Sequence, residues 1–86
     1  MTTADSSTPV EAPDQQFDAR GMICPLPVLK ARKRLAAMAA GEVLEVLATD
    51  AAAPEDFRQF CAATGHQLLA MEEDGGTARI QVRCVR

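Results

Sequence analysis

Apolar side chains recur along the chain at two spacings, one typical of helices and the other of strands. From Pro25 to about Ala40 the spacing is helical. The predicted core face of this helix carries Val28, Ala31, Leu35, Met38 and Ala39. A second helix is predicted after a turn over residues 50–56. A proline and two acids stand at its start, as is typical of a helix N-terminus. Its stripe is Phe57, Phe60, Cys61 and Thr64. Gly41 and Gly65 are the expected helix ends, since glycine adopts the left-handed conformation that often follows a helix.

Four other segments are short and have the composition or the alternation of strands. They cover residues 17–20, 42–49, 66–73 and 77–86. The last alternates with a two-residue period, and its apolar positions are Ala78, Ile80, Val82 and Cys84. The sequence Asp-Gly-Gly at residues 74–76 predicts a tight turn before it, so the last two strands form an antiparallel hairpin.

The predicted order of elements is therefore β-α-β-α-β-β. A helix joins the first two strands, which predicts that they run parallel with a right-handed crossover. The expected fold is an α/β (α+β) two-layer sandwich, in which two helices cover one face of a four-stranded mixed sheet.

The first fifteen residues differ in composition from the rest of the chain. Residues 1–15 are rich in Ser, Thr, Pro and acids, so we expect a disordered acidic tail, followed by one domain over residues 16–86. Three of the twelve acids lie in this tail: Asp5, Glu11 and Asp14. The remaining nine match the nine Lys and Arg, so the net charge of −3 belongs to the tail. A neutral domain argues against DNA binding, which needs an excess of cations.

The sequence contains no apolar run long enough to span a membrane and no secretory signal pattern. We therefore expect a cytoplasmic protein without a membrane partner, and a monomer. The three cysteines are odd in number and widely spaced, so a disulfide framework is not expected. A zinc site is not expected either, because His66 is the sole histidine.

Cys24 is the candidate reactive residue. It follows a glycine-bearing turn at Gly21 and precedes Pro25, which suits the first position of a helix. Cys24 is thus the predicted N-cap, where free N–H groups and the helix dipole would lower its pKa. Pro27 stiffens the approach to the sulfur, and Arg20 is a nearby cation. The alternative is a buried structural cysteine that happens to precede a proline.

The other cysteines and the histidine are better explained by structure than by chemistry. Cys61 lies on the aromatic stripe of the second helix and Cys84 on the apolar face of the last strand, so both are expected in the core. His66 is expected at a strand edge. Cys24 then has no general base or resolving cysteine beside it in sequence, which suits acyl transfer poorly. It suits transfer of sulfur, in which a thiolate attacks a persulfide.

The face of the first helix opposite its apolar stripe is basic. It carries Leu26, Lys30, Lys33 and Arg34. This face is a candidate docking surface for an acidic partner or for RNA phosphates. Equally, it is an ordinary solvated face with cations in the C-terminal half of a helix.

The residues around Cys24 also form a recognisable signature. Its members are Asp18, Gly21, Cys24, Pro25, Pro27 and Lys30. Further matching pairs are Gly41-Glu42, Thr49-Asp50, Asp56-Phe57, Phe60-Cys61 and Gly65-His66. Over residues 17–86 the chain resembles the TusA/SirA-like sulfur carriers, with their CPxP motif. The resemblance implies a βαβαββ fold and a persulfide on Cys24 in place of any separate cofactor. It also implies a cysteine desulfurase or rhodanese as donor and a downstream acceptor protein, in tRNA 2-thiouridine synthesis, sulfur oxidation or cofactor sulfuration.

The chain departs from the family pattern at two positions, of which the first bears on partner choice and the second is expected only to loosen a turn. Leu26 stands between the prolines, where the tRNA-thiolation type usually has an acid, and Ala51 replaces a common proline. Two other functional classes remain open. A thiol redox sensor would need a resolving cysteine, and a non-catalytic RNA- or protein-binding module would need the basic face and not Cys24.

Overall fold

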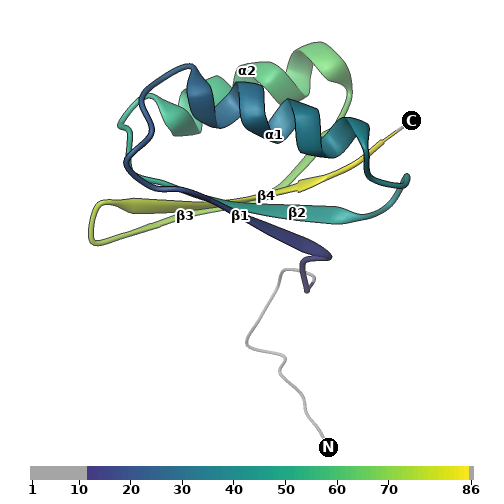
Figure 1. Cartoon of the computed structure of the whole chain (residues 1–86), viewed down its shortest axis with the longest axis horizontal. Helices are drawn as coiled ribbons and strands as arrows, with labels where there is room; N and C mark the ends of the chain where they lie inside the picture. Colours follow the sequence, from purple (N-terminus) through teal and green to yellow (C-terminus); the bar gives the residue numbers. More distant parts are fainter. Residues whose placement is uncertain (1–11, 86) are drawn as a thin grey trace, which may run out of the picture.

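The computed structural model describes residues 12–85, and over this range the chain forms four strands and two helices in the predicted order (Figure 1). The strands are β1 (Gln15–Ala19), β2 (Val43–Ala48), β3 (Gln67–Asp74) and β4 (Thr77–Arg83), and the helices are α1 (Leu26–Ala36) and α2 (Ala53–Thr64). Neither described helix is long and apolar enough to cross a membrane.

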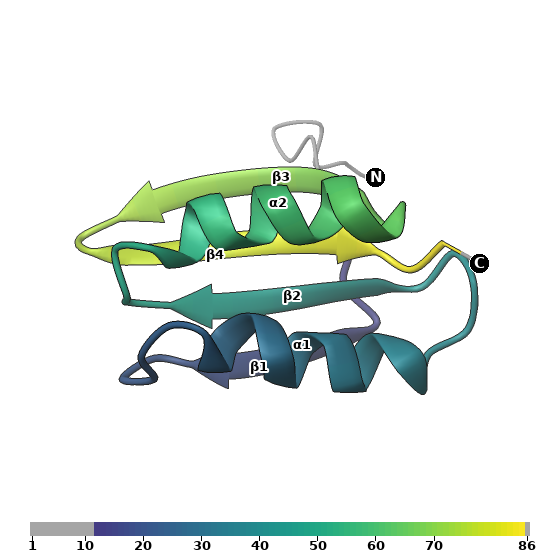
Figure 2. The same ribbon diagram turned by 90° about the horizontal axis from the view of Figure 1, so that it is seen from above.

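The sheet has the order β1-β2-β4-β3. As predicted, β1 pairs parallel with β2, while β4 pairs antiparallel with both β2 and β3. Both helices lie on the same face of the sheet (Figure 1). Seen from above, α1 lies on the β1 side and α2 on the side of β3 and β4 (Figure 2). The predicted two-layer sandwich is confirmed.

The core lies between the sheet and the helices. It is built from most of both helical stripes and the inward side chains of the strands: Phe17, Ala31, Leu35, Met38, Leu44, Val46, Phe57, Phe60, Ile80 and Val82. Cys61 and Cys84 are buried within it, as predicted. Ala39 and Thr64, which were predicted on these stripes, are exposed at the ends of the helical segments. The edge of Phe57 meets the ring of Phe60 at a centroid distance of 6.4 Å. This apolar layer holds α2 against β4, and α2 carries part of the site described below.

The first helix is shorter than predicted and buries a different first-turn residue. It ends at Ala36, because the backbone N–H groups of Ala37 and Met38 donate to carbonyls only three residues back. Pro27 is buried where Val28 was expected, and Val28 is half-buried. The residues between Ala36 and Gly41 therefore form a turn and are not part of the helix. Met38, within this turn, is still buried in the core.

The N-terminal strand begins before residue 17. Gln15 pairs with Leu44 as the first residue of β1, although the sequence pattern assigned it to the tail. Asp14 extends the pairing, because its backbone N–H donates to the carbonyl of Val43 and its carboxylate accepts from the Val43 N–H. The rest of the predicted tail, over residues 1–11, lies outside the described residues.

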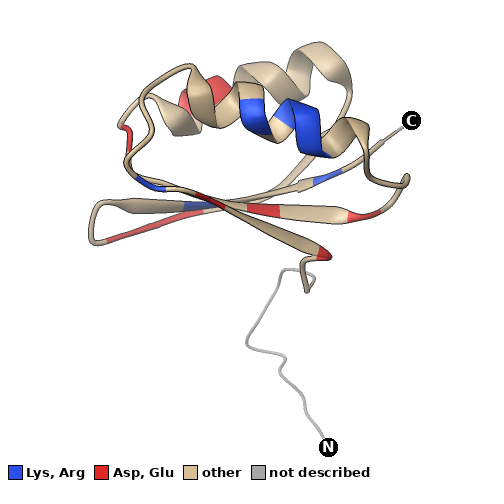
Figure 3. Cartoon of the chain, in the orientation of Figure 1, with Lys and Arg blue, Asp and Glu red and all other residues tan. Residues whose placement is uncertain are grey.

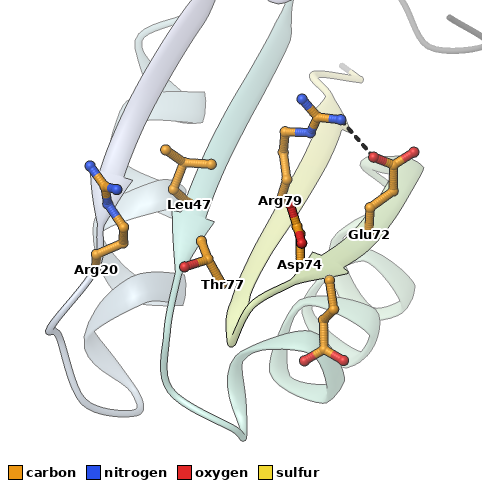
Figure 4. Close-up of a pocket in the computed structure, with 7 residues that line it drawn as sticks. Arg20, Leu47, Glu72, Asp74, Thr77 and Arg79 are labelled. Atoms are coloured by element: carbon orange, nitrogen blue, oxygen red, sulfur yellow. Dashed lines mark hydrogen bonds and ion pairs between the residues drawn. The ribbon is translucent and has the colours of Figure 1, made fainter.

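The face of the sheet away from the helices is polar. Glu45 is buried there and accepts hydrogen bonds from the side chains of Gln16 and Gln81. Arg79 bridges Glu45 and Glu72, as the dashed line to Glu72 in Figure 4 shows. These residues border a shallow cavity of about 360 Å³ lined by Arg20, Leu47, Glu72, Glu73, Asp74, Thr77 and Arg79. Gln81 is therefore buried, although the strand alternation had placed it on the solvent side.

Candidate functional site

Cys24 lies in the loop between β1 and α1, and it is the one exposed cysteine of the three. Gly21 opens this loop with a φ of 84°, which favours glycine, and its N–H donates to the hydroxyl of Thr49. The backbone N–H of Cys24 donates to the carboxylate of Asp50, and the peptide bond between Cys24 and Pro25 is cis. The loop is thus tied to the end of β2 at two points, and these ties place the sulfur at the surface.

The thiol does not cap α1, as the sequence pattern predicted. Helix α1 begins at Leu26, and Pro25 stands at its N-cap without a side-chain hydrogen bond. Instead, Sγ of Cys24 donates to Oδ2 of Asp56 at 2.8 Å. Asp56 lies in the first turn of α2, which packs beside α1. The prediction was wrong because the thiol has a strong acceptor on the neighbouring helix.

The predicted lowering of the Cys24 pKa is wrong for the same reason. The hydrogen bond to the Asp56 carboxylate raises the pKa of the thiol, because it stabilises the protonated form. Partial desolvation and the negative charges of Asp56 and Asp50 raise it further. Both carboxylates therefore favour the thiol form of Cys24 over the thiolate.

A shallow hollow of about 340 Å³ opens beside the sulfur. It is lined by Cys24, Pro25, Val28, Asp56, Gln59 and Phe60. Its apolar part is formed by Pro25, Val28 and Phe60. Two more large apolar side chains close to Cys24 in sequence are exposed, since Ile23 is 71% and Leu26 44% accessible. The sulfur is thus presented on a surface with an apolar rim and an acidic side, which suits contact with another macromolecule.

Arg20, predicted as a supporting residue of the site, has a different role. Its guanidinium donates two hydrogen bonds to Asp18, and these bonds hold the pKa of that carboxyl at about 2. Arg20 also lines the cavity on the helix-free face of the sheet, where Figure 4 shows it. The ion pair shapes the end of β1, and it faces away from the hollow beside Cys24.

Four basic residues lie along α1, where Figure 3 shows them in blue, and three of them are the ones predicted to share a face. Lys30, Lys33 and Arg34 are exposed and line a groove of about 520 Å³ together with Phe17, Met22 and Ala37. The guanidinium of Arg34 lies 4.9 Å from the centre of the Phe17 ring. Because these cations project from α1 opposite Val28, the groove and the hollow at Cys24 lie on two sides of the helix.

Sequence reasoning missed Asp50 and Asp56. Both acids were interpreted only as part of a turn and a helix start, which is the ordinary role of acids in the first turn of a helix. The signal that could have found them was the pair of motifs Thr49-Asp50 and Asp56-Phe57, which belong to the same family pattern as the cysteine. Neither motif is near Cys24 in sequence, so the folded chain was needed to bring them together.

Comparison with known proteins identifies the family. The model of the family described as sulfurtransferase TusA matches residues 15–84. The chain belongs to the TusA family. This TusA-family chain is 56% identical over 62 residues to NMA0882 of Neisseria meningitidis, a protein named as a candidate sulfur carrier, and the match covers 71% of this chain and 84% of that protein. It is 49% identical over 63 residues to the sulfur carrier protein TusA of Allochromatium vinosum, covering 73% of this chain and 83% of that protein.

A solved structure supports the same assignment. The SirA-like protein of Desulfitobacterium hafniense matches this TusA-family fold with a TM-score of 0.73 and 29% sequence identity. The match covers 84% of this chain and 99% of that one. The fold and the family agree, and a general role in carrying sulfur follows from the family.

Proposed function

We propose that this protein carries sulfur as a persulfide on Cys24, which it receives from one protein and hands to another. The observation that carries the proposal is the exposure of Cys24 in a surface hollow, while Cys61 and Cys84 are buried. A thiol that exchanges sulfur between large partners must be reachable by both of them. Membership of the TusA family supports the same role.

The chemistry needs two exchanges. In the first, the Cys24 thiol loses its proton, and the thiolate attacks the outer sulfur of a donor persulfide. The S–S bond of the donor breaks, the donor leaves as a thiolate, and Cys24 holds the outer sulfur with its hydrogen. In the second, an acceptor thiolate attacks that outer sulfur and Cys24 leaves as a thiolate, which regains a proton. The donor class is a cysteine desulfurase or a rhodanese, and the acceptor is a protein of tRNA thiolation, sulfur oxidation or cofactor sulfuration.

Two other functions suit the site less well. A redox sensor would pair Cys24 with a second accessible cysteine, whereas the other two are buried. A non-catalytic binding module would have no need of an exposed thiol in a hollow. Both alternatives are distinguished from sulfur transfer by whether Cys24 becomes a persulfide.

Loading with sulfur tests the proposal directly. After incubation with a cysteine desulfurase and cysteine, we expect intact mass spectrometry to show one added sulfur atom. Peptide mapping should place it on the peptide that contains Cys24. Sulfur found mainly on Cys61 or Cys84 would contradict the assignment, because it would mean that a core cysteine is the carrier.

The basic face of α1 is the proposed docking surface for a sulfur-transfer partner, with Leu26 at its edge. Lys30 and Lys33 are exposed, so replacing both by glutamate should change stability by no more than about 0.5 kcal/mol per site. Sulfur transfer to or from a cognate partner should slow at low salt, because the reversed charges oppose electrostatic steering, and the difference should shrink as salt rises.

Transfer rates measured between low and high salt check this prediction. Arg58→Glu is the matched control, since it reverses an exposed cation on α2 away from the groove. If both charge reversals slow transfer equally, or neither does, the α1 cations form only a solvated helix face.

A further inference from the structure

Two carboxylates from separate elements surround the reactive sulfur. Asp50 follows β2 and accepts the backbone N–H of Cys24, while its second oxygen accepts the N–H of Ala52. Asp56 lies in the first turn of α2 and accepts the thiol itself at 2.8 Å. Asp50 is therefore occupied by backbone groups, whereas the bond to Asp56 is one that any stronger donor could replace.

The charges that act on the sulfur from these elements are all negative. Asp56 and Asp50 both raise the pKa of the thiol, from α2 and from the loop after β2. Of the four cations of α1, Lys30, Lys33 and Arg34 line the groove on the other side of the helix, and Arg32 is exposed to solvent. Arg20 is paired with Asp18. An isolated molecule thus holds its sulfur-accepting group in the form that does not attack.

We propose that Asp56 acts as an electrostatic lock on Cys24, which a cationic group on the docking partner releases. The inference rests on the proposed function, since it concerns how the same thiol is switched on. The geometry that supports it is the hollow beside the sulfur, into which both Asp56 and Cys24 open. A partner side chain that enters this hollow meets the carboxylate and the thiol together.

The release follows from exchange of hydrogen bonds. A guanidinium or ammonium group pairs with the Asp56 carboxylate and forms charge-assisted hydrogen bonds that are stronger than the one from the thiol. The thiol loses its acceptor and the nearby negative charge is neutralised, so its proton passes to water. The resulting thiolate attacks the outer sulfur of the partner's persulfide. The partner surface that fits is therefore apolar opposite Val28 and Phe60, which line the hollow, and carries a cation opposite Asp56.

Charged thiol reagents test the lock without any protein partner. The two probes are methanethiosulfonates of similar size, one ending in trimethylammonium and the other in sulfonate. Both transfer their thioalkyl group to a thiolate and release methanesulfinate. We expect wild-type Cys24 to favour the cationic reagent. Asp56→Asn should reduce the ratio of the two rates about 25-fold, because removing one unit charge nearby in water-like surroundings changes each rate about fivefold, in opposite directions. The same variant should react about fivefold faster with neutral iodoacetamide at pH 7.

Glu55→Gln provides the matched control, because it removes a negative charge from the adjacent position of α2, where Glu55 pairs with Arg58. It should leave both the ratio and the iodoacetamide rate unchanged. Asp56→Ser is a second variant that keeps a polar group in the first turn of α2 if the asparagine variant unfolds. An unchanged ratio in both folded Asp56 variants would overturn the lock.

Sulfur loading from a protein donor distinguishes two roles of Asp56. In the lock, a cation of the partner pairs with Asp56; in the alternative, Asp56 only disfavours the thiolate. Loading of Asp56→Asn from a cysteine desulfurase should be slower than wild type, although its thiol is more reactive toward iodoacetamide. If loading becomes faster as well, Asp56 merely suppresses the thiolate and no partner cation uses it. Failure of the proposed function looks different, because no persulfide would then form on wild-type Cys24 while the reagent ratio would still report the lock.

Discussion

Replacement of Cys24 by serine is expected to reduce sulfur loading and relay to background. Oxygen cannot hold the transferred sulfur as a persulfide, and neither buried cysteine is accessible to a donor protein. The serine hydroxyl can still donate to Asp56, so the contact between the loop and α2 is retained. The loss should therefore be one of chemistry and not of folding. Transfer of labelled sulfur from a desulfurase, followed to an acceptor protein, measures it.

The matched control for this variant is Cys61→Ala. Cys61 is 7% exposed and packs in the core, so its removal should lower stability while leaving sulfur loading intact. Loading that persists in Cys24→Ser, or that disappears in folded Cys61→Ala, would contradict Cys24 as the carrier. Circular dichroism of both variants confirms that the comparison is made between folded proteins.

Truncation of Phe57 is expected to cause the largest loss of stability. This side chain is fully buried beneath α2, and its ring contacts Phe60. Phe57→Ala should lower the free energy of unfolding by about 3–5 kcal/mol, from lost transfer energy and the cavity left behind. A small domain is stable by only about 5–15 kcal/mol, so a substantial unfolded fraction is expected on warming. Sulfur loading should fall in parallel, because Phe57 adjoins Asp56 on the helix that borders the site.

Urea unfolding followed by circular dichroism measures this effect as a lower midpoint with an unchanged slope. Gln59→Ala is the control, since Gln59 is exposed on the same helix and its loss should cost no more than about 0.5 kcal/mol. A loss below about 1 kcal/mol in Phe57→Ala would mean that α2 is not held by this aromatic contact.

The fold could be predicted from the sequence because its determinants are local. The apolar stripe of α2 and the alternation along β4 each predict which side chains face the core. Gly65 ends α2 with a φ of 88°, as expected of a glycine after a helix. Element ends were less predictable. The last turn of α1 ends early through local bonds to carbonyls three residues back. The first residues of β1 depend on hydrogen bonds to β2, such as the bonds between Asp14 and Val43. Gln81 was misplaced for the same reason, because Glu45 on a neighbouring strand buries it.

For the candidate site, too, the features that depend on local sequence patterns could be predicted. The motif around Cys24 predicted the reactive residue, and the structure exposes that cysteine at the surface. The core stripes correctly predicted that Cys61 and Cys84 would be buried. The sequence by itself also determined that Lys30, Lys33 and Arg34 would share one exposed face of α1, because a helix repeats every 3.6 residues. These conclusions need only the period of an element and the chemistry of its side chains.

Only the tertiary structure decided the direction in which the pKa of the Cys24 thiol is shifted. Sequence reasoning set Cys24 beside a helix dipole and predicted a low pKa, whereas the folded chain sets it beside Asp56, thirty-two positions away. A full negative charge in hydrogen-bond contact outweighs the partial charge of a helix end, so the direction of the shift is reversed. That contact exists because α1 and α2 pack side by side on one sheet, an arrangement that brings together residues no local pattern connects.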